Sequence, residues 1–234
     1  MPTYRELFDA HRGRLIAKIN HFFDDYELHL ARVRRDGIRI LEIGISGGGS
    51  LELWLAYFGT DASVHGVDID PAAIENCPPG AHAHLGSQID VEFLHGLCDR
   101  HGPFDLIVDD GSHLVEHQIA TFEALYPTMS ADGLYICEDS FTSYWPEYGG
   151  GVGEPGTFVE YAKRKVDELH AFWVDDGSIE ATAFTASTRS ITILSGAVLF
   201  ERAERAAPTY DARAGDHAYS GTVAELHESA RRTV

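Results

Sequence analysis

Acidic side chains gather at two points of the sequence, each directly after an apolar run. Asp109 and Asp110 follow the first run, and Glu138 and Asp139 follow the second. If both runs are strands of one parallel sheet, their carboxyl ends meet at the same edge. Clustered carboxylates are costly without a compensating cation, and ligands that are all oxygen favour Mg²⁺ or Mn²⁺ over zinc. We therefore predict a divalent metal held by Asp110, Glu138 and Asp139.

His113 lies three residues beyond Asp110, on the turn that should leave the first strand. A metal at this edge would acidify a hydroxyl group of the acceptor. An imidazole suits the removal of such a proton near neutral pH, so we predict His113 as the general base. The alternative is that the acids only cap helices and that His113 is an ordinary turn residue.

The segment from His113 to His117 also matches H-x-x-E-H, the zinc-binding signature of inverzincin proteases. That motif needs both histidines on one helical face. Here it would have to open a helix straight after a strand-end turn in a Rossmann-like sheet, which is the wrong context. A structural role is therefore favoured for His117.

A glycine-rich turn, Gly44 and Gly47–Gly49, joins an apolar run to a helical stretch. A backbone without Cβ atoms lets a ligand approach closely, and the amides of a helix N-terminus favour a carboxylate. Nicotinamide enzymes have a similar turn, but Glu42 just before it favours S-adenosylmethionine (SAM). Asp68 ends the next run, where a carboxylate can accept both hydroxyls of a ribose.

Further candidates for cofactor binding lie near the same strand ends. Ser87, Gln88 and Asp90 stand where an adenine could be bordered, and capping of the following helix is the alternative for Asp90. Asp70 is better explained as a helix N-cap. The complete predicted set for the cofactor is Glu42, Gly44, Ser46, Ser50, Asp68, Ser87, Gln88 and Asp109.

The elements that must position these residues alternate between strands and helices, which indicates a parallel α/β sheet. The expected strands are Ile38–Ile43, Val64–Val67, Ala81–Leu85, Phe104–Val108 and Leu134–Cys137. The expected crossover helices are Ser50–Phe58, Pro71–Asn76, Asp90–Arg100 and Val115–Met129.

Helical spacing predicts a layer over Tyr4–Arg35 and a further helix over Thr157–Trp173. Between them, the irregular segment Ser143–Gly156 is a candidate lid. Ile179–Thr185 is expected as a strand, and Ser190–Leu194 with Ala197–Arg202 as an antiparallel edge hairpin. The domain division is a helical cover (1–36), a methyltransferase domain (37–202) and a tail (203–234) with one helical pattern at Val223–Ala230.

These motifs together resemble the class I, metal-dependent sugar O-methyltransferases, of which the macrolide-sugar and mycinamicin-type enzymes are nearest in pattern. The resemblance covers roughly Tyr4 to Arg202. It rests on the stretches LEIGISGGGSLELWLAYFG, VHGVDIDP, FDLIVDDGSHLVEHQIATFEALYP and GLYICEDSFTSYWPEYGGG. It implies a Rossmann-like fold with a mostly parallel seven-stranded sheet, an antiparallel C-terminal hairpin and an N-terminal helical layer.

The resemblance also implies the same metal ligands, the same base and a sugar acceptor. Thr142, Tyr144 and Trp145 are expected to wall the acceptor pocket, with packing beneath a loop as the alternative. An N-terminal segment would cover the site, and its candidates are Arg12, Arg14, Lys18 and His21. Ser112, where relatives often carry a second glycine, is a small departure in the turn.

Composition limits the kinds of binding partner and the cellular location that we expect for this protein. The 18 basic and 37 acidic residues give a net charge of −19, which disfavours nucleic acid and anionic membranes. The three cysteines show no disulfide or metal spacing, and no apolar run could span a bilayer. We expect a cytoplasmic protein, and the apolar residues of the helix over 158–173 favour a homo-oligomer.

The leading hypothesis is methyl transfer from SAM to a sugar hydroxyl of a glycoside, natural product or polysaccharide. The acceptor is therefore a small molecule or an oligosaccharide. A catechol or small-phenol O-methyltransferase is the enzymatic alternative, because a vicinal diol could chelate the same metal. A SAM-binding subunit that activates a partner without catalysis is the alternative from another class.

Overall fold

A seven-stranded sheet forms the centre of the computed structural model, which describes residues 2–214, 217–222, 225 and 228. Its strand order is β3-β2-β1-β4-β5-β7-β6. All neighbours from β3 to β5 are parallel, whereas β7 runs antiparallel to β5 and β6. The strands are β1 (Arg39–Ile43), β2 (Ser63–Asp68), β3 (Ala81–Leu85), β4 (Leu106–Asp109), β5 (Leu134–Cys137), β6 (Thr188–Ile193) and β7 (Val198–Arg202). The predicted fold class and edge hairpin are confirmed.

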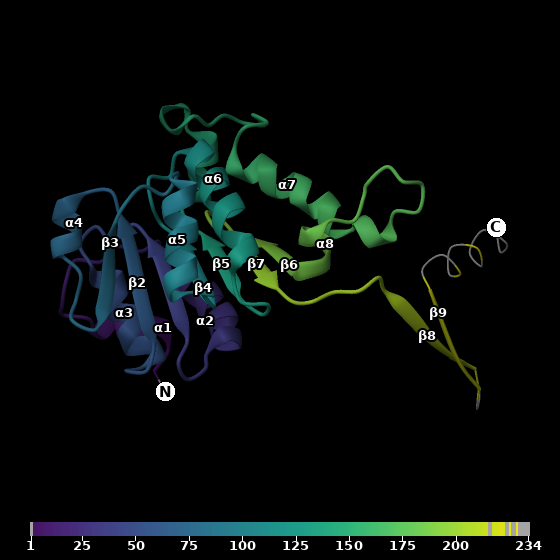
Figure 1. The fold of residues 1–234 in the computed structure, drawn as a ribbon, viewed down its shortest axis with the longest axis horizontal. Helices are drawn as coiled ribbons and strands as arrows, with labels where there is room; N and C mark the ends of the chain where they lie inside the picture. Colours follow the sequence, from purple (N-terminus) through teal and green to yellow (C-terminus); the bar gives the residue numbers. More distant parts are fainter. Residues whose placement is uncertain (1, 215–216, 223–224, 226–227, 229–234) are drawn as a thin grey trace.

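Helices cover both faces of the sheet (Figure 1). One face packs against α1 (Tyr4–Ala10), α2 (Phe22–Val33), α3 (Gly49–Phe58) and α4 (Pro71–Glu75). The other packs against α5 (Val91–His101), α6 (Val115–Leu125), α7 (Phe158–Leu169) and α8 (Ala183–Ser187). Ile40 faces the first layer and Leu41 the second. This double burial explains the continuous apolar runs of the central strands.

Local capping chemistry sets where the crossover helices begin. The side chain of Asp70 accepts a hydrogen bond from the Ala72 N–H, and Pro71 occupies the first helical turn of α4. The side chain of Asp90 accepts from the Phe93 N–H at the start of α5. Both predicted N-caps are confirmed. Their residue types were sufficient because a cap depends only on neighbours within one turn.

The N-terminal layer is interrupted rather than continuously helical. Residues 11–21 form an irregular segment between α1 and α2. This segment lies over the glycine-rich turn, where the Gly49 N–H donates to the carbonyl oxygen of Leu15 at 3.1 Å. The irregular N-terminal segment therefore packs directly against the glycine-rich turn at the carboxyl edge of the sheet.

The predicted strand Ile179–Thr185 is wrong, because its second half begins α8. The Thr182 side chain accepts from the backbone N–H groups of Phe184 and Thr185, and the Thr185 side chain accepts from the Thr182 N–H. This reciprocal capping box satisfies helix donors that a strand would pair with a neighbour. The long helices expected around 115–129 and 157–173 end in the 3₁₀ turns η1 (Tyr126–Thr128) and η4 (Ala171–Trp173).

The C-terminal tail contains an unpredicted antiparallel hairpin, β8 (Thr209–Ala214) and β9 (His217–Thr222). Figure 1 shows it extending away from the main sheet. The helical pattern expected at Val223–Ala230 lies largely outside the described residues. None of the helices in the described part of the chain has the length and apolarity that crossing a bilayer demands.

The apolar side of α7 is covered within the chain. Phe158, Tyr161 and Ala162 are buried, and the rings of Phe158 and Tyr161 contact Phe122 on α6. Part of the surface that motivated the homo-oligomer expectation is therefore internal, whereas Trp173 is 49% exposed. Oligomeric state stays a prediction.

Candidate active site

Backbone hydrogen bonds join the ends of four strands, β2, β1, β4 and β5, at the carboxyl edge of the sheet. The Gly44 N–H donates to the Val67 carbonyl at 2.8 Å, and the Asp110 N–H donates to the Ile43 carbonyl at 3.0 Å. The Glu138 N–H donates to the Asp109 carbonyl at 2.9 Å. The turns after β1, β4 and β5 therefore lie side by side, which brings the two acidic clusters together as predicted.

His113 stands between two of the predicted metal ligands. Its Nε2 lies 3.6 Å from Asp139 Oδ2 and 4.0 Å from Asp110 Oδ1. Its Nδ1 is buried and has no hydrogen-bond partner among the described residues. A ring nitrogen close to two carboxylates is placed to exchange a proton with a group bound between them.

Backbone geometry fixes this arrangement. His113 and Asp139 adopt positive φ angles of 57° and 51°, a left-handed conformation that is uncommon for residues other than glycine and gathers at functional sites. The Thr142 hydroxyl donates to the carbonyl of His113 at 2.9 Å, or alternatively to that of Asp139 at 2.9 Å. Thr142 thus ties the two turns together from beneath.

Glu138 turns toward the N-terminal layer rather than toward His113. The Tyr26 hydroxyl donates to Glu138 Oε1 at 2.6 Å. Burial and the nearby Asp110 charge together raise the pKa of this carboxyl to about 8, although Lys18 and Tyr26 oppose the shift. Tyr26 was not selected from the sequence, because nothing in the pattern of α2 points to a partner on β5.

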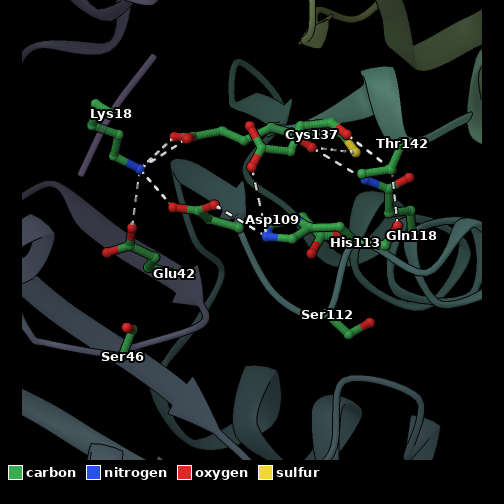
Figure 2. A network of polar contacts seen from close by, with 12 residues as sticks. Lys18, Glu42, Ser46, Asp109, Ser112, His113, Gln118, Cys137 and Thr142 are labelled. Atoms are coloured by element: carbon green, nitrogen blue, oxygen red, sulfur yellow. Dashed lines mark hydrogen bonds and ion pairs between the residues drawn. The ribbon is translucent and has the colours of Figure 1, made fainter. Parts of the chain in front are cut away.

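Lys18 provides the cation that the carboxylates need in this structure. Its Nζ donates to Asp110 Oδ2 at 2.7 Å and to Glu138 Oε1 and Oε2 at 2.8 and 2.9 Å, and lies 3.8 Å from Glu42 Oε1. The side chain is only 2% exposed. Figure 2 shows Lys18 and His113 on opposite sides of this network. Burial lowers the pKa of Lys18, but the three carboxylates outweigh it and hold the pKa well above the usual value.

Lys18 was one of four N-terminal residues expected to face the site, and the other three have different partners. Arg14 Nη1 donates to Glu52 at 2.6 Å. Arg12 donates to the backbone carbonyls of Asp9 and His11. His21 is the N-cap of α2 and makes no capping bond with its side chain.

The donor set at this edge suits a divalent cation. Asp110, His113 and Asp139 each offer a ligand atom within 4.8 Å of the others, and Glu138 adds a carboxylate beside Asp110 through their shared contact with Lys18. The carboxylate oxygens of this set match Mg²⁺ or Mn²⁺, and the His113 ring stands beside them. One ammonium does not neutralise the carboxylates of Glu42, Asp110, Glu138 and Asp139, so added positive charge would be stabilising here.

The two histidines of the H-x-x-E-H motif have separate environments. His113 lies before α6, whereas His117 is on it, and His117 Nδ1 lies 2.8 Å from Ser112 Oγ. Ser112 in turn donates its backbone N–H to Gln88 Oε1 at 2.8 Å. His117 therefore supports the turn.

Close packing explains the glycines of the cofactor turn. Gly44 has φ of 96°, and a Cβ there would lie 2.2 Å from the Asp110 carbonyl oxygen. A Cβ on Gly49 would lie 2.5 Å from the Leu15 carbonyl oxygen. The glycines were expected to make room for a ligand. In the structure they make room for the β4 turn and the N-terminal segment.

Two neighbouring cavities open on this edge. One, of about 340 Å³, is lined by Leu15–Lys18, the glycine turn, Asp110, His113 and Asp139. The other, of about 310 Å³, is lined on its far side by Asp68, Ile69, Ser87 and Gln88. Gly44, Ser46, Asp110 and Gly111 line both. The two cavities thus share a wall.

The carboxylate of Asp68 is held by the glycine turn. Asp68 Oδ2 accepts from the backbone N–H groups of Ile45 at 2.9 Å and Ser46 at 3.1 Å. Oδ1 accepts from the Asp70 N–H at 2.9 Å. Asp68 and Ser46 therefore reach the second cavity in a fixed orientation.

Three predicted cofactor residues, Gln88, Asp109 and Ser50, are engaged in hydrogen bonds within the protein. Gln88 bridges Ser112 and Asp109, with Nε2 at 3.2 Å from Asp109 Oδ1. Asp109 is buried, and burial raises the pKa of its carboxyl to about 7. Ser50 lines the first cavity but donates its hydroxyl to Glu42 Oε2 at 2.6 Å. Their direct contact with a cofactor stays a prediction.

Glu42 is completely buried, and its Oε1 has no hydrogen-bond partner among the described residues. Oε2 accepts from Ser50 and from Trp54 Nε1 at 3.0 Å. Burial raises the pKa of Glu42 to about 7, although Lys18 opposes this shift.

Glu42→Gln should remove a pH-dependent part of the stability. A carboxyl whose pKa is raised by folding stabilises the protein below its unfolded pKa and loses that contribution as pH rises through the folded pKa. For Glu42 this window runs from 4.5 to about 7, and it corresponds to roughly 3 kcal/mol. Urea unfolding of both proteins in EDTA at several pH values measures it. A pH-independent difference between them would refute the assignment.

One of the three predicted acceptor residues is buried and two are exposed. Thr142 is buried and hydrogen-bonds to the two turns, whereas Tyr144 and Trp145 are 48% and 44% exposed. The Trp145 ring contacts Phe141 and Tyr148. Neither exposed aromatic lines the two cavities, so their contact with an acceptor stays a prediction.

The chain is similar to known methyltransferases. The chain is 39% identical over 177 residues to the 8-demethyl-8-(2-methoxy-alpha-L-rhamnosyl)-tetracenomycin-C 3'-O-methyltransferase of Streptomyces olivaceus, covering 68% of this chain and 45% of that protein. It is 37% identical to the mycinamicin VI 2''-O-methyltransferase of Micromonospora griseorubida, covering 72% and 44% respectively. The chain spans less than half the length of these curated relatives. No family model matches.

Solved structures agree with this relationship. The MycE methyltransferase of mycinamycin biosynthesis, crystallised with Mg and SAH, superposes with a TM-score of 0.77 and 28% identity. The match covers 87% of this chain and 55% of MycE. Another crystal of MycE also holds mycinamycin VI. A caffeoyl-CoA O-methyltransferase-like protein from Staphylococcus aureus, at 14% identity and a TM-score of 0.53, shares the fold alone.

Proposed function

Because the chain is related to the SAM- and Mg²⁺-dependent sugar O-methyltransferases, we propose that it transfers a methyl group from SAM to a sugar hydroxyl. The observation that carries this proposal is the shared wall of the two cavities. Gly44, Ser46, Asp110 and Gly111 border both the Asp68 side and the His113 side. A cofactor seated along Asp68 would therefore end beside the base and the carboxylates.

Each group at this edge has a distinct role in the proposed reaction. SAM would supply the electrophilic methyl group, and Asp110, Asp139 and Glu138 would hold a Mg²⁺ ion that serves as a Lewis acid. Asp68 holds the ribose end of the cofactor. His113 takes the acceptor proton at Nε2, and the adjacent Asp110 and Asp139 stabilise the resulting imidazolium.

The N-terminal segment contributes by closing the site. Leu15–Lys18 line the first cavity, and the Leu15 carbonyl accepts from Gly49. A cover that excludes water strengthens the electrostatic interactions beneath it. Lys18 offsets the negative charge of the carboxylates while the segment is closed.

The proposed acceptor class is a glycoside, and Tyr144 and Trp145, which are exposed and follow the acidic pair in the sequence, are its proposed aromatic contacts. An exposed aromatic side chain suits a sugar ring, which combines apolar faces with hydroxyl groups. Methyl transfer from labelled SAM to rhamnosyl and other deoxysugar glycosides, compared with catechols of similar size, tests this class. Preference for the catechols would replace the proposal with the phenol alternative. If no glycoside and no catechol is methylated, the sugar proposal and the phenol alternative are both contradicted.

Removal of divalent metal should abolish methyl transfer, and Mg²⁺ should restore it. The carboxylates at this edge would keep Lys18 as their counter-ion in EDTA, so the protein should remain folded. Initial rates and circular dichroism in EDTA, then after Mg²⁺ is added back, separate loss of activity from loss of structure. Full activity in EDTA would show that Lys18 alone supplies the positive charge.

The remaining expectations on partners follow from charge and context. The net charge of −19 is repulsive toward nucleic acid and anionic lipid. A homo-oligomer and a cytoplasmic location, where SAM is made, remain predictions; sedimentation of the purified chain measures the first.

A further inference from the structure

A second cluster of titratable residues lies on the face of the sheet that α5 covers. His65 is on β2, His84 is on the neighbouring β3, and His101 is the last residue of α5. His82, the register partner of His65 on β3, stacks against the His65 ring at a centroid distance of 4.9 Å. None of the four histidines lines the two cavities of the candidate active site, so methyl transfer leaves them without a role.

Three of these rings converge on one point. His65 Nδ1 lies 3.0 Å from His84 Nε2. His65, His84 and His101 each offer a ring nitrogen within 4.8 Å of the others. A four-coordinate zinc ion with bonds of 2.0–2.1 Å would space its nitrogen ligands by about 3.3 Å. The His65 and His84 rings therefore need to separate by only a few tenths of an ångström.

The state of the rings suits metal binding. Burial, together with the charges of the neighbouring histidines, lowers the pKa of His65 to about 3 and that of His84 to about 4. Neutral imidazoles, the form that binds metal, therefore predominate at neutral pH. The positive charge of Arg100 also lowers the pKa of His84, and it is unfavourable for a bound cation.

An outer contact also orients the buried ligand. The second ring nitrogen of His65, Nε2, lies 2.9 Å from Ser63 Oγ. Ligating histidines usually donate their other N–H to such an acceptor, which fixes the tautomer and leaves the facing nitrogen free to bind. In His65 that facing nitrogen is Nδ1, the one that points at His84.

We propose that His65, His84 and His101 form a binding site for a transition-metal ion of the zinc class, separate from the magnesium site. Three imidazoles leave the fourth position of a tetrahedral ion for water. The ion would tie the end of α5 to β2 and β3, since these three elements each supply one ligand.

Zn²⁺ binding to the full chain in excess Mg²⁺ tests the proposal. The double variant Asp110→Asn/Asp139→Asn, which lacks the active-site carboxylates, should still bind one Zn²⁺ by calorimetry. In that background His84→Gln and His101→Gln should each weaken Zn²⁺ binding at least about tenfold. His170→Gln, an exposed histidine at the end of α7, should leave it unchanged.

His101→Gln is the variant least expected to disturb folding, because His101 is partly exposed and is the last residue of α5. Zn²⁺ should raise the melting temperature of the Asp110→Asn/Asp139→Asn protein, and of the same protein with His170→Gln, but not when it carries His101→Gln. If the Asp110→Asn/Asp139→Asn protein loses Zn²⁺ binding, or if His101→Gln binds as tightly as its parent, the histidines are only a hydrogen-bonded stack and the proposal fails. The methyltransferase proposal would be unaffected by this outcome, because these histidines do not line the two cavities of the candidate active site.

Discussion

His113→Ala should lower the rate of methyl transfer by about 10²–10⁴-fold, the usual contribution of a general base. The ring nitrogen within 4 Å of Asp110 and Asp139 would be lost. Binding of SAM should change little, because His113 lines the first cavity and not the one beside Asp68. Single-turnover rates with labelled SAM and calorimetric SAM binding measure the two effects separately.

His113→Asn is the matched control for the turn. Position 113 has a φ of 57°, and asparagine tolerates this left-handed region better than alanine. If loss of the base is the cause, both variants should be equally inactive, and free imidazole should restore part of the rate to His113→Ala. Substantial activity in His113→Asn would assign the histidine to the turn instead of the chemistry.

Lys18→Met should destabilise the protein by about 3–5 kcal/mol in EDTA, since it removes one partner from a buried ionic cluster. Methionine fills a similar volume, so the loss reflects charge. Asp110 and Glu138, which now share the ammonium, would be left beside one another without a cation. Urea unfolding at neutral pH in EDTA gives the free energy of unfolding.

Mg²⁺ should restore much of that stability, and Lys18→Met should bind Mg²⁺ more tightly than the wild-type chain does. Both follow if the ammonium and the metal compete for the same carboxylates. Arg14→Ala is the control, because its pair with Glu52 is 36% exposed on the arginine side and should be worth at most about 1 kcal/mol. Equal stability of Lys18→Met and wild type in EDTA would show that Lys18 does not hold the cluster.

The sequence by itself determined the elements whose signals are local. The central strands are apolar runs because both of their faces are buried, and the caps Asp70 and Asp90 act within one helical turn. The proximity of the two acidic clusters could be predicted because each cluster follows one of two neighbouring parallel strands. The expectation that Asp110 and Asp139 meet beside His113 needed nothing more than that rule.

The tertiary structure alone decided which distant side chains complete the site. Lys18 is 92 residues from Asp110 and 120 from Glu138 in the sequence, and Tyr26 is 112 from Glu138. Sequence periodicity does not relate positions so far apart, because their contact depends on how the N-terminal layer packs against the sheet. The same limit applies to Gly49, whose close neighbour is the Leu15 backbone, and to the histidines of β2, β3 and α5. Residue types showed which chemistry this chain could perform, and packing decided which cation stands among the carboxylates.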